Sequence, residues 1–305
     1  MVDTMDTIYQ RQNEPGMIAA QKAARCLYRK AKIITGLNYI ITIFLAVLFA
    51  VLATFIDDER VGYWSFALSI IIFFVNFVFD YSIQKIKALA AGLQQYFDVN
   101  VFGLDRTKKY ISKGIPERQK RINVIAKYKD KDVGDVSNWY DDYSGLSQNN
   151  QILKCQEQNI RWDGELRKRY IWVLIALCVI EVLVIVTFAI HGTGIINGIA
   201  VAVWVVPILK VAITTIVNLA KDIKRLNEIE QETEQAEAQS QNEEKLFECV
   251  CDLQHLIYEH RSQCCLIPDF FYKIFRKADE IREDKIKDET LREEKQNESD
   301  DKGED

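Results

Sequence analysis

Histidine is scarce in this chain, and the short motifs that mark common enzyme sites are missing. Only three histidines occur among 305 residues, and His191 lies in a predicted turn between two apolar stretches. The sequence has no glycine-rich phosphate loop, no nucleophile elbow and no zinc-protease motif. We therefore expect no catalytic residues, no cofactor and a protein that is not an enzyme.

The cysteines do not follow a disulfide or metal pattern. There are seven of them, and Cys178 lies within an apolar run, so we expect reduced thiols in a cytoplasmic setting. Cys251 and His255 are four residues apart, as are His260 and Cys264, but a zinc site needs four converging ligands. The two pairs point in different directions on a helix. We therefore expect no metal site.

Excess negative charge is confined to the C-terminal end. The net charge is −5, and residues 279–305 carry thirteen acids and six bases, so the rest of the chain is slightly basic. This end is also low in aromatic residues. We expect 279–305 to be an acidic disordered tail that is dispensable for folding.

What the chain has in abundance is long apolar runs. They lie at residues 37–56, 62–79, 170–190 and 194–219. A span needs roughly 20 apolar residues to cross about 30 Å of hydrocarbon, and runs of this length are rare as buried helices of soluble folds. We therefore predict an all-α protein with four transmembrane helices in two hairpins and a helical cytosolic stalk domain. The first run is too long for the core of a cleaved signal peptide, so none is expected.

Lysine and arginine gather on one side of these runs. They are frequent before residue 37, between 80 and 169, and directly after 219, whereas the hairpin loops at 57–61 and 191–193 contain one base between them. By the positive-inside rule, both termini and the central loop are cytoplasmic.

Helical periodicity continues from the spans into the cytosolic parts. We predict that residues 17–34 lead into the first span, that 150–170 enter the third without a break, and that 220–262 extend the fourth as one inward stalk. Ile267-Pro268-Asp269 ends this stalk, and a short helix follows over 270–281. The predicted divisions of the chain are 1–36, 37–80, 81–169, 170–219, 220–278 and 279–305.

Two opposite charges interrupt the last two spans. Glu181 and Lys210 lie at similar depths when counted from the inner ends of their apolar runs, and an ionisable group in a span asks for a partner. The pair could line or gate a pore, or it could be a structural ion pair; Lys210 could instead extend towards the inner interface. Asn76 and Asn197 could add hydrogen bonds between helices.

Aromatic and basic residues of the cytosolic part are candidates for a nucleobase and phosphate site, because aromatic faces beside guanidinium groups suit both. The candidates are Trp139, Tyr140, Arg161, Arg167, Arg261 and Tyr272. The alternative is packing between stalk helices, which we favour for Trp162.

Several of these stretches together resemble the SMODS-associating four-transmembrane effectors of bacterial cyclic-oligonucleotide signalling. The resemblance covers about residues 13–280, and Phe270 stands where the family usually has tryptophan. It rests on Ala24, Leu27, Tyr28, Ala31, Lys32, Asn138-Trp139-Tyr140, Asp142, Cys155-Gln156, Asn159, Trp162-Asp163, Leu166-Arg167, Tyr170, Tyr258, Arg261, Ile267-Pro268-Asp269 and Tyr272.

The resemblance implies an antiphage effector of the bacterial inner membrane. A separate nucleotidyltransferase would make a cyclic oligonucleotide, and this chain, as a homo-oligomer in the lipid bilayer, would respond by opening a pore or disrupting the membrane. No DNA or RNA polymer is implied as a partner. Two alternatives remain: an ion channel or transporter unrelated to defence, and a non-conducting membrane scaffold.

Overall fold

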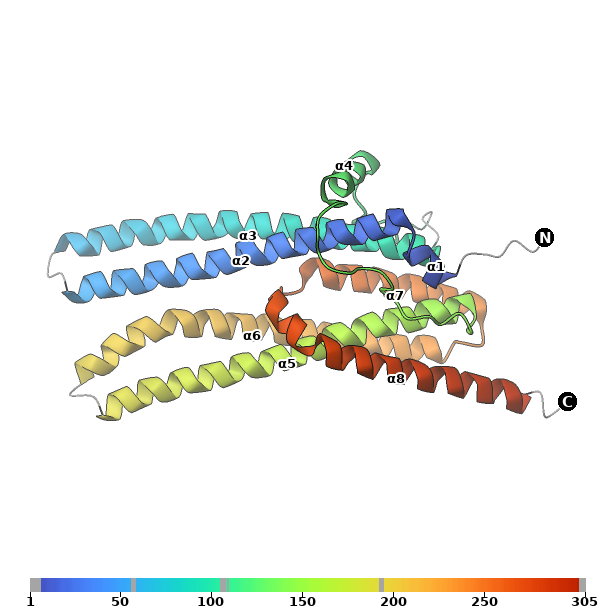
Figure 1. The fold of residues 1–305 in the computed structure, drawn as a ribbon. Coiled ribbons are helices and arrows are strands. Elements are labelled where there is room, and N and C mark those ends of the chain that lie inside the picture. The colour runs from blue at the N-terminus through green and yellow to red at the C-terminus, as the bar shows by residue number, and fades with distance from the viewer. Residues whose placement is uncertain (1–6, 56–58, 105–107, 109, 192–194, 302–305) are drawn as a thin grey trace.

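The computed structural model describes residues 7–55, 59–104, 108, 110–191 and 195–301, and all regular secondary structure in these residues is helical (Figure 1). This confirms the predicted all-α class. The helices are α1 (Ile8–Gln12), α2 (Pro15–Phe55), α3 (Glu59–Phe102), α4 (Arg118–Tyr128), α5 (Gln148–His191), α6 (Ile195–Glu237), α7 (Glu243–Gln263) and α8 (Asp269–Asp301).

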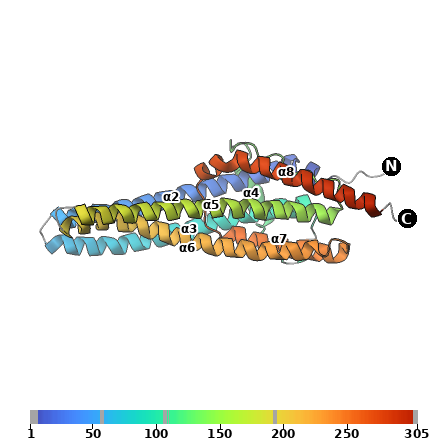
Figure 2. The same ribbon diagram turned by 90° about the horizontal axis from the view of Figure 1, so that it is seen from below.

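Four long helices form two hairpins that lie side by side. Helix α2 packs against α3, and α5 packs against α6. Figures 1 and 2 show the tips of both hairpins at one end of the molecule and both chain termini at the other. As predicted, the helices that approach residues 37 and 170 continue without a break, because α2 begins at Pro15 and α5 at Gln148.

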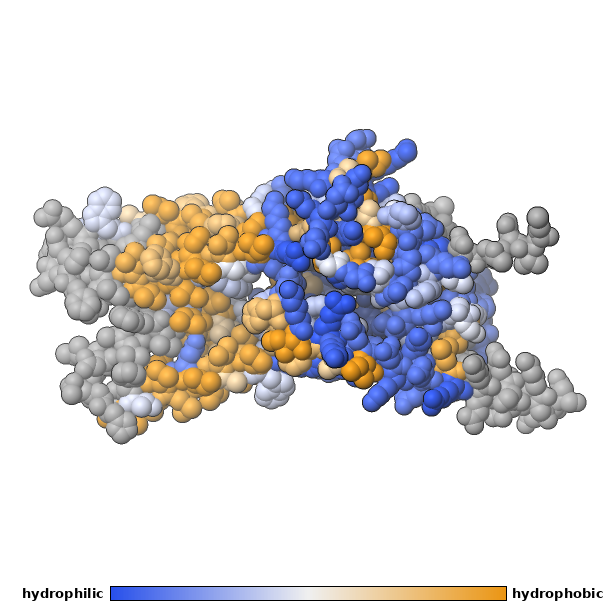
Figure 3. All heavy atoms as spheres, in the orientation of Figure 1, coloured by the Kyte–Doolittle hydropathy of each residue, from blue (hydrophilic) through white to orange (hydrophobic). Residues whose placement is uncertain are grey.

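The hairpin end of the molecule has an apolar surface (Figure 3). Exposed large apolar residues recur on all four arms, for example Phe44, Phe73, Leu183 and Ile213. Within the part of the chain that the structure describes, one helix, the Gln148–Thr187 part of α5, is long and apolar enough to cross a membrane. The other three predicted runs each include residues whose side chains lie outside that part.

The opposite end has a polar surface and a packed core. Phe97 and Phe102 on α3, Ile152 on α5 and Leu253 on α7 are buried in one cluster. The apolar stripe of α7, from Leu246 to Ile257, faces this cluster because its apolar residues recur every three or four positions.

The inward stalk of α6 is not continuous, and the prediction of one helix over 220–262 was wrong. Helix α6 ends at Glu237, and α7 turns back along it (Figure 1). The Asn242 side chain caps the new helix by accepting a hydrogen bond from the Lys245 amide at 3.1 Å. The reversal lets α7 cover Leu226 and Ile229 of α6, which lie in the same core cluster.

The C-terminal helix is longer than predicted. Helix α8 begins at Asp269 and continues to Asp301, although the sequence predicted a disordered tail from residue 279. Two of the acids at the start of this segment, Asp279 and Glu283, are buried against α5. They receive hydrogen bonds from Arg169 and Arg161. The start of α8 is held by apolar packing of Phe271 and Phe275, and charge pairing holds the part from Asp279 onward.

The segment between α3 and α5 contains one short helix, α4, and three glycines with left-handed backbone conformations. Gly103, Gly114 and Gly134 have φ values of +70°, +78° and +78°, a region that favours glycine. At Gly114 a β-carbon would also lie 1.9 Å from the Tyr258 ring. Glycine is therefore required there both by conformation and by space.

Candidate functional site

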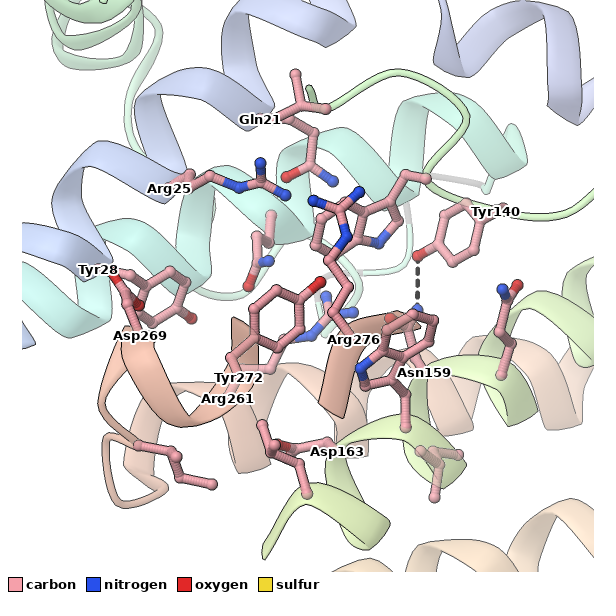
Figure 4. Close-up of a pocket in the computed structure, with 18 of the residues that line it drawn as sticks. Gln21, Arg25, Tyr28, Tyr140, Asn159, Asp163, Arg261, Asp269, Tyr272 and Arg276 are labelled. Carbon is pink, nitrogen blue, oxygen red and sulfur yellow. Dashed lines mark hydrogen bonds between the residues drawn. The ribbon is translucent and has the colours of Figure 1, made fainter. Parts of the chain in front are cut away.

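A cavity of about 690 Å³ lies where the two hairpins meet at the polar end (Figure 4). Its walls come from α2, the loop 132–141, α5, the end of α7 and the start of α8. Segments far apart in the sequence therefore share one space, and a molecule bound there would touch both hairpins.

The loop over residues 132–141 is held in place by side chains from the N-terminal helices. The Gln12 side chain donates to the Tyr140 carbonyl at 2.9 Å and accepts from the Tyr140 amide at 2.7 Å. Arg25 donates from Nη1 to the carbonyls of Val133 (3.2 Å) and Asp135 (2.7 Å). These bonds fix the loop as one wall of the cavity.

Most of the predicted ligand-binding residues line this cavity. The structure brings together Trp139, Tyr140, Arg167, Arg261 and Tyr272. Arg161 does not line the cavity; it forms an ion pair with Glu283, which does.

Tyr140 and Arg261 belong to a buried network at the side of the cavity. The Tyr140 hydroxyl donates to Asp98 Oδ1 at 2.7 Å and accepts from Asn159 Nδ2 at 2.8 Å. Arg261 Nη1 donates to Asp98 Oδ2 at 2.5 Å. Burial and the Asp98 charge raise the pKa of Tyr140, so this phenol stays neutral. With Tyr140 only 1% exposed, the network shapes the wall.

Arg167 is also committed to internal partners. It donates to Asp163 and Asp222, each at 2.9 Å, and to the Cys265 carbonyl at 3.0 Å. His260 Nε2 lies 2.7 Å from the same Asp163 carboxylate. Burial alone would raise the pKa of Asp163, but Arg167 and His260 outweigh it and hold that pKa well below its usual range. Arg167 therefore ties α5 to α6 and to the segment after α7.

The cations facing the cavity are ones that the sequence did not single out. Arg25, Arg29 and Lys32 follow at spacings of four and three on α2, so they share one helix face. Lys273 and Arg276 lie across from them on α8, and all five line the cavity. Burial and the neighbouring Arg276 and Arg29 lower the pKa of Arg25, as expected where like charges gather. The spacing of Arg25, Arg29 and Lys32 in the sequence indicates a shared helix face. In the sequence analysis these basic residues served to predict the cytoplasmic side of the membrane.

Aromatic rings accompany these cations. The Arg25 guanidinium lies 5.7 Å from the centre of the Trp139 ring. Trp162 and Tyr272 are stacked, with ring centres 6.4 Å apart and planes at 28°. Trp162 lines the cavity and packs against Tyr272 of α8, which follows the end of the predicted stalk.

The cavity therefore offers flat apolar faces beside positive charge. Such a combination stacks nucleobases and pairs with phosphate, and the volume is within the range of small-ligand sites. Among the described residues no group of three or more histidine, cysteine or acidic side chains is arranged to hold a metal ion.

Of the two asparagines predicted to form hydrogen bonds between the arms, the structure describes the side chain of Asn76. Thr42 on α2 donates to Asn76 Oδ1 on α3 at 3.0 Å, so Asn76 makes the predicted hydrogen bond between helices. Asn197 lies on α6, but its side chain is outside the described residues.

Glu181 and Lys210 do not form an ion pair in the structure. Glu181 Oε2 is buried without a hydrogen-bond partner among the described residues, and Lys210 is exposed. The inner ends of the two apolar runs are level, because Arg167 on α5 pairs with Asp222 on α6 at 2.9 Å. Counted from that pair, Glu181 is 14 residues along α5 and Lys210 is 12 residues along α6, or about 21 and 18 Å. The two residues therefore lie at similar depths, but they do not pair.

Comparison with known proteins gives one family. Residues 6–289 match the model of the SMODS-associating 4TM effector domain, which is nearly the whole chain. No curated protein and no solved structure matches the chain significantly. The match extends from the loop-holding helix α1 through the cavity and both hairpins into α8. The chain therefore belongs to the SMODS-associating 4TM effector domain family.

Proposed function

We propose that this chain is a membrane effector that is switched on by a cyclic oligonucleotide bound in the cavity between its hairpins. A separate nucleotidyltransferase would make the signal, and the response would be a pore in, or disruption of, the bacterial inner membrane. The chain itself would carry out no enzymatic reaction. The observation that carries the proposal is the cavity, whose walls place aromatic rings beside seven arginines and lysines, together with eight acidic side chains.

All four arms would span the bilayer. The exposed apolar residues of α2, α3, α5 and α6 lie at the same end of the molecule, and the family name describes a four-transmembrane domain. Both termini lie at the opposite, polar end. With lysine and arginine concentrated there, that end would face the cytoplasm.

The ligand would contact both hairpins at once. Arg25 and Arg29 on α2 would meet its phosphates, and Trp139 and Tyr272 would stack on its bases. A ligand that binds one relative position of the hairpins better than another shifts the population towards it. Binding in the cytoplasm would thus change how the arms sit in the membrane.

Several copies would act together. The Glu181 oxygen without a partner among the described residues lies in an apolar arm, where an unpaired carboxylate is costly. Assembly of the arms into a homo-oligomer would give such a group a polar surrounding. This supports a pore or a locally disrupted bilayer as the active form.

The test is dye leakage from vesicles containing the purified protein, with and without the products of a partner cyclic-oligonucleotide synthase. Leakage that requires the synthase product is the expected result. Trp139→Ala should abolish it at the same ligand concentration, whereas Ile122→Ala, an exposed change on α4, should not. Leakage without any product would indicate a constitutive channel or transporter, and no leakage under any condition would indicate a scaffold.

A further inference from the structure

A single carboxylate forms ion pairs with two of the cations that line the cavity. Asp269 Oδ1 lies 2.5 Å from Lys32 Nζ, and Asp269 Oδ2 lies 3.8 Å from Arg29 Nε. Asp269 is the first residue of α8, and Figure 4 shows it beside α2 at the edge of the cavity. The contact therefore joins α8 to the first hairpin.

The same helix is attached to the second hairpin farther along. Arg161 Nη2 on α5 lies 2.7 Å from Glu283 Oε2, and Arg169 Nη1 lies 2.8 Å from Asp279 Oδ1. Helix α8 is thus a strap: its first residue holds α2, whereas Phe271, two residues later, packs on Tyr170 of α5 and the middle of the helix also holds α5.

The two attachments differ in strength. The side chains of Asp269 and Arg29 are 43% and 45% exposed, and exposed ion pairs contribute little to stability. The Glu283 and Asp279 carboxylates are 3% and 2% exposed, so losing their partners would leave buried charges uncompensated. The contact with α2 is therefore the one that an external anion can replace.

We propose that Arg29 and Lys32 form a phosphate subsite, and that Asp269 occupies it when no ligand is bound. A phosphate group of the ligand displaces the Asp269 carboxylate, because it carries at least equal charge and more acceptor oxygens. Asp269 then leaves α2, while Phe271 and the middle of α8 stay on α5. This inference rests on the proposed function for the identity of the ligand, but not for the subsite itself.

Hydrogen exchange of the full-length protein in phosphatidylcholine nanodiscs tests the subsite without any nucleotide. The reporter is the pair of Phe271 and Tyr272 amides, which donate to the Pro268 carbonyl beside Asp269. Asp269→Asn should speed their exchange several-fold, and Asp269→Glu should not. Glu280→Gln is the matched control, because Glu280 also lines the cavity from α8 but pairs with Arg276 on its own helix. Equal exchange in Asp269→Asn and the control would overturn the proposal.

Inorganic pyrophosphate is the ligand probe. It should speed exchange of the same amides in the wild type and have no further effect in Asp269→Asn, and Asp269→Asn should bind it several-fold more tightly. Slower or unchanged exchange with pyrophosphate would overturn displacement. A parallel arm uses nanodiscs with phosphatidylglycerol and no pyrophosphate; faster exchange there would support the subsite and assign its phosphate to a lipid headgroup.

The two proposals fail separately. If cyclic oligonucleotides cause no leakage but Asp269→Asn and pyrophosphate act as expected, the proposed function fails and the subsite stands. If leakage follows the synthase product while exchange in α8 is unchanged, the subsite alone is wrong.

Discussion

Arg161 on α5 and Glu283 on α8 form a two-point ion pair across 122 positions of sequence, with Nη2–Oε2 and Nε–Oε2 distances of 2.7 and 3.1 Å. The carboxylate is 3% exposed, whereas the guanidinium is 27% exposed. The Glu283 carboxylate is therefore the buried member of the pair. Removing Arg161 would leave this carboxylate buried without its partner.

The Arg161–Glu283 and Arg169–Asp279 pairs determine how much of α8 is needed for stability. Truncation after Ala278 removes both buried acids, and we expect it to lower the free energy of unfolding by about 2–4 kcal/mol. Truncation after Glu283 keeps both acids and should lower it by less than about 1 kcal/mol. Thermal melts of the two truncations in the same detergent compare them directly. Equal melting temperatures would show that Asp279 and Glu283 do not anchor the helix.

Two aromatic rings of the cavity should have opposite effects: Tyr272 on ligand binding and Tyr140 on folding. Base stacking contributes about 1–3 kcal/mol per base, so Tyr272→Ala should weaken binding of the synthase product roughly 5- to 150-fold. Tyr140→Phe should do the reverse: it removes a hydroxyl bonded to Asp98 and Asn159 and should lower the melting temperature while leaving affinity within about twofold. Isothermal titration and thermal melts separate the two effects. If the Tyr140→Phe protein has normal stability but poor affinity, Tyr140 contacts the ligand directly.

Glu157 should make the cytosolic end less stable as the pH rises. Burial raises the pKa of Glu157 to about 7, and the nearby Lys154 offsets this only in part. The folded state thus holds a proton that the unfolded chain releases near its usual value of about 4.3. The resulting stability is present at low pH and is lost as the pH rises through about 7.

Melting temperatures from pH 5.5 to 8.5 test this prediction. Glu157→Gln should remove much of the fall in stability and should be more stable than the wild type at pH 8.5. Glu165→Gln, on the same helix, makes the same change at a more exposed carboxylate and should leave the slope as it is. Parallel curves for wild type and Glu157→Gln would contradict the assignment.

Glu181 and Lys210 should behave independently. Because no ion pair joins them among the described residues, a double-mutant cycle with Glu181→Leu and Lys210→Leu should give a coupling below about 0.5 kcal/mol. Unfolding in mixed micelles measures it. A coupling of 1 kcal/mol or more would mean that the two side chains meet in the membrane.

Topology follows from the charge distribution. Reporter fusions at Glu59 and Gly192 should report the outside, and fusions at Lys129 and Asp305 the cytoplasm. A cytoplasmic signal from either hairpin loop would mean that the corresponding pair of helices is inverted or does not span the membrane.

The sequence predicted the features that depend on local periodicity. The entry helices followed from helical spacing, because spacing decides which side chains share a face. The five candidate residues that line the cavity were instead predicted from residue type, as aromatic and basic side chains, and Trp139 and Tyr140 lie in a loop. The reversal between α6 and α7 was missed since no glycine or proline lies in 238–242. It is stabilised by burial against Leu226 and Ile229, which only the folded chain brings together.

Long-range pairing was the other source of error. Nothing near Asp279 or Glu283 in the sequence marks them as buried, because their partners are Arg169 and Arg161 on another helix. The same holds for Asp269, whose cations are on α2. Acid-rich composition indicates disorder only when no basic surface is available to bind the segment.

Helix α5 gives the site a mechanical connection to the apolar end. It runs unbroken for 44 residues, about 66 Å at 1.5 Å per residue, and contains no proline. Its first half holds Asn159 and Trp162 at the cavity, and its second half carries Leu183 at the apolar surface. A stiff rod of this length amplifies rotation: a tilt of about 5° moves one end by roughly 6 Å relative to the other. Under the proposed function, a small shift at the cavity would therefore be enough to change which arms touch in the bilayer, without any helix unfolding.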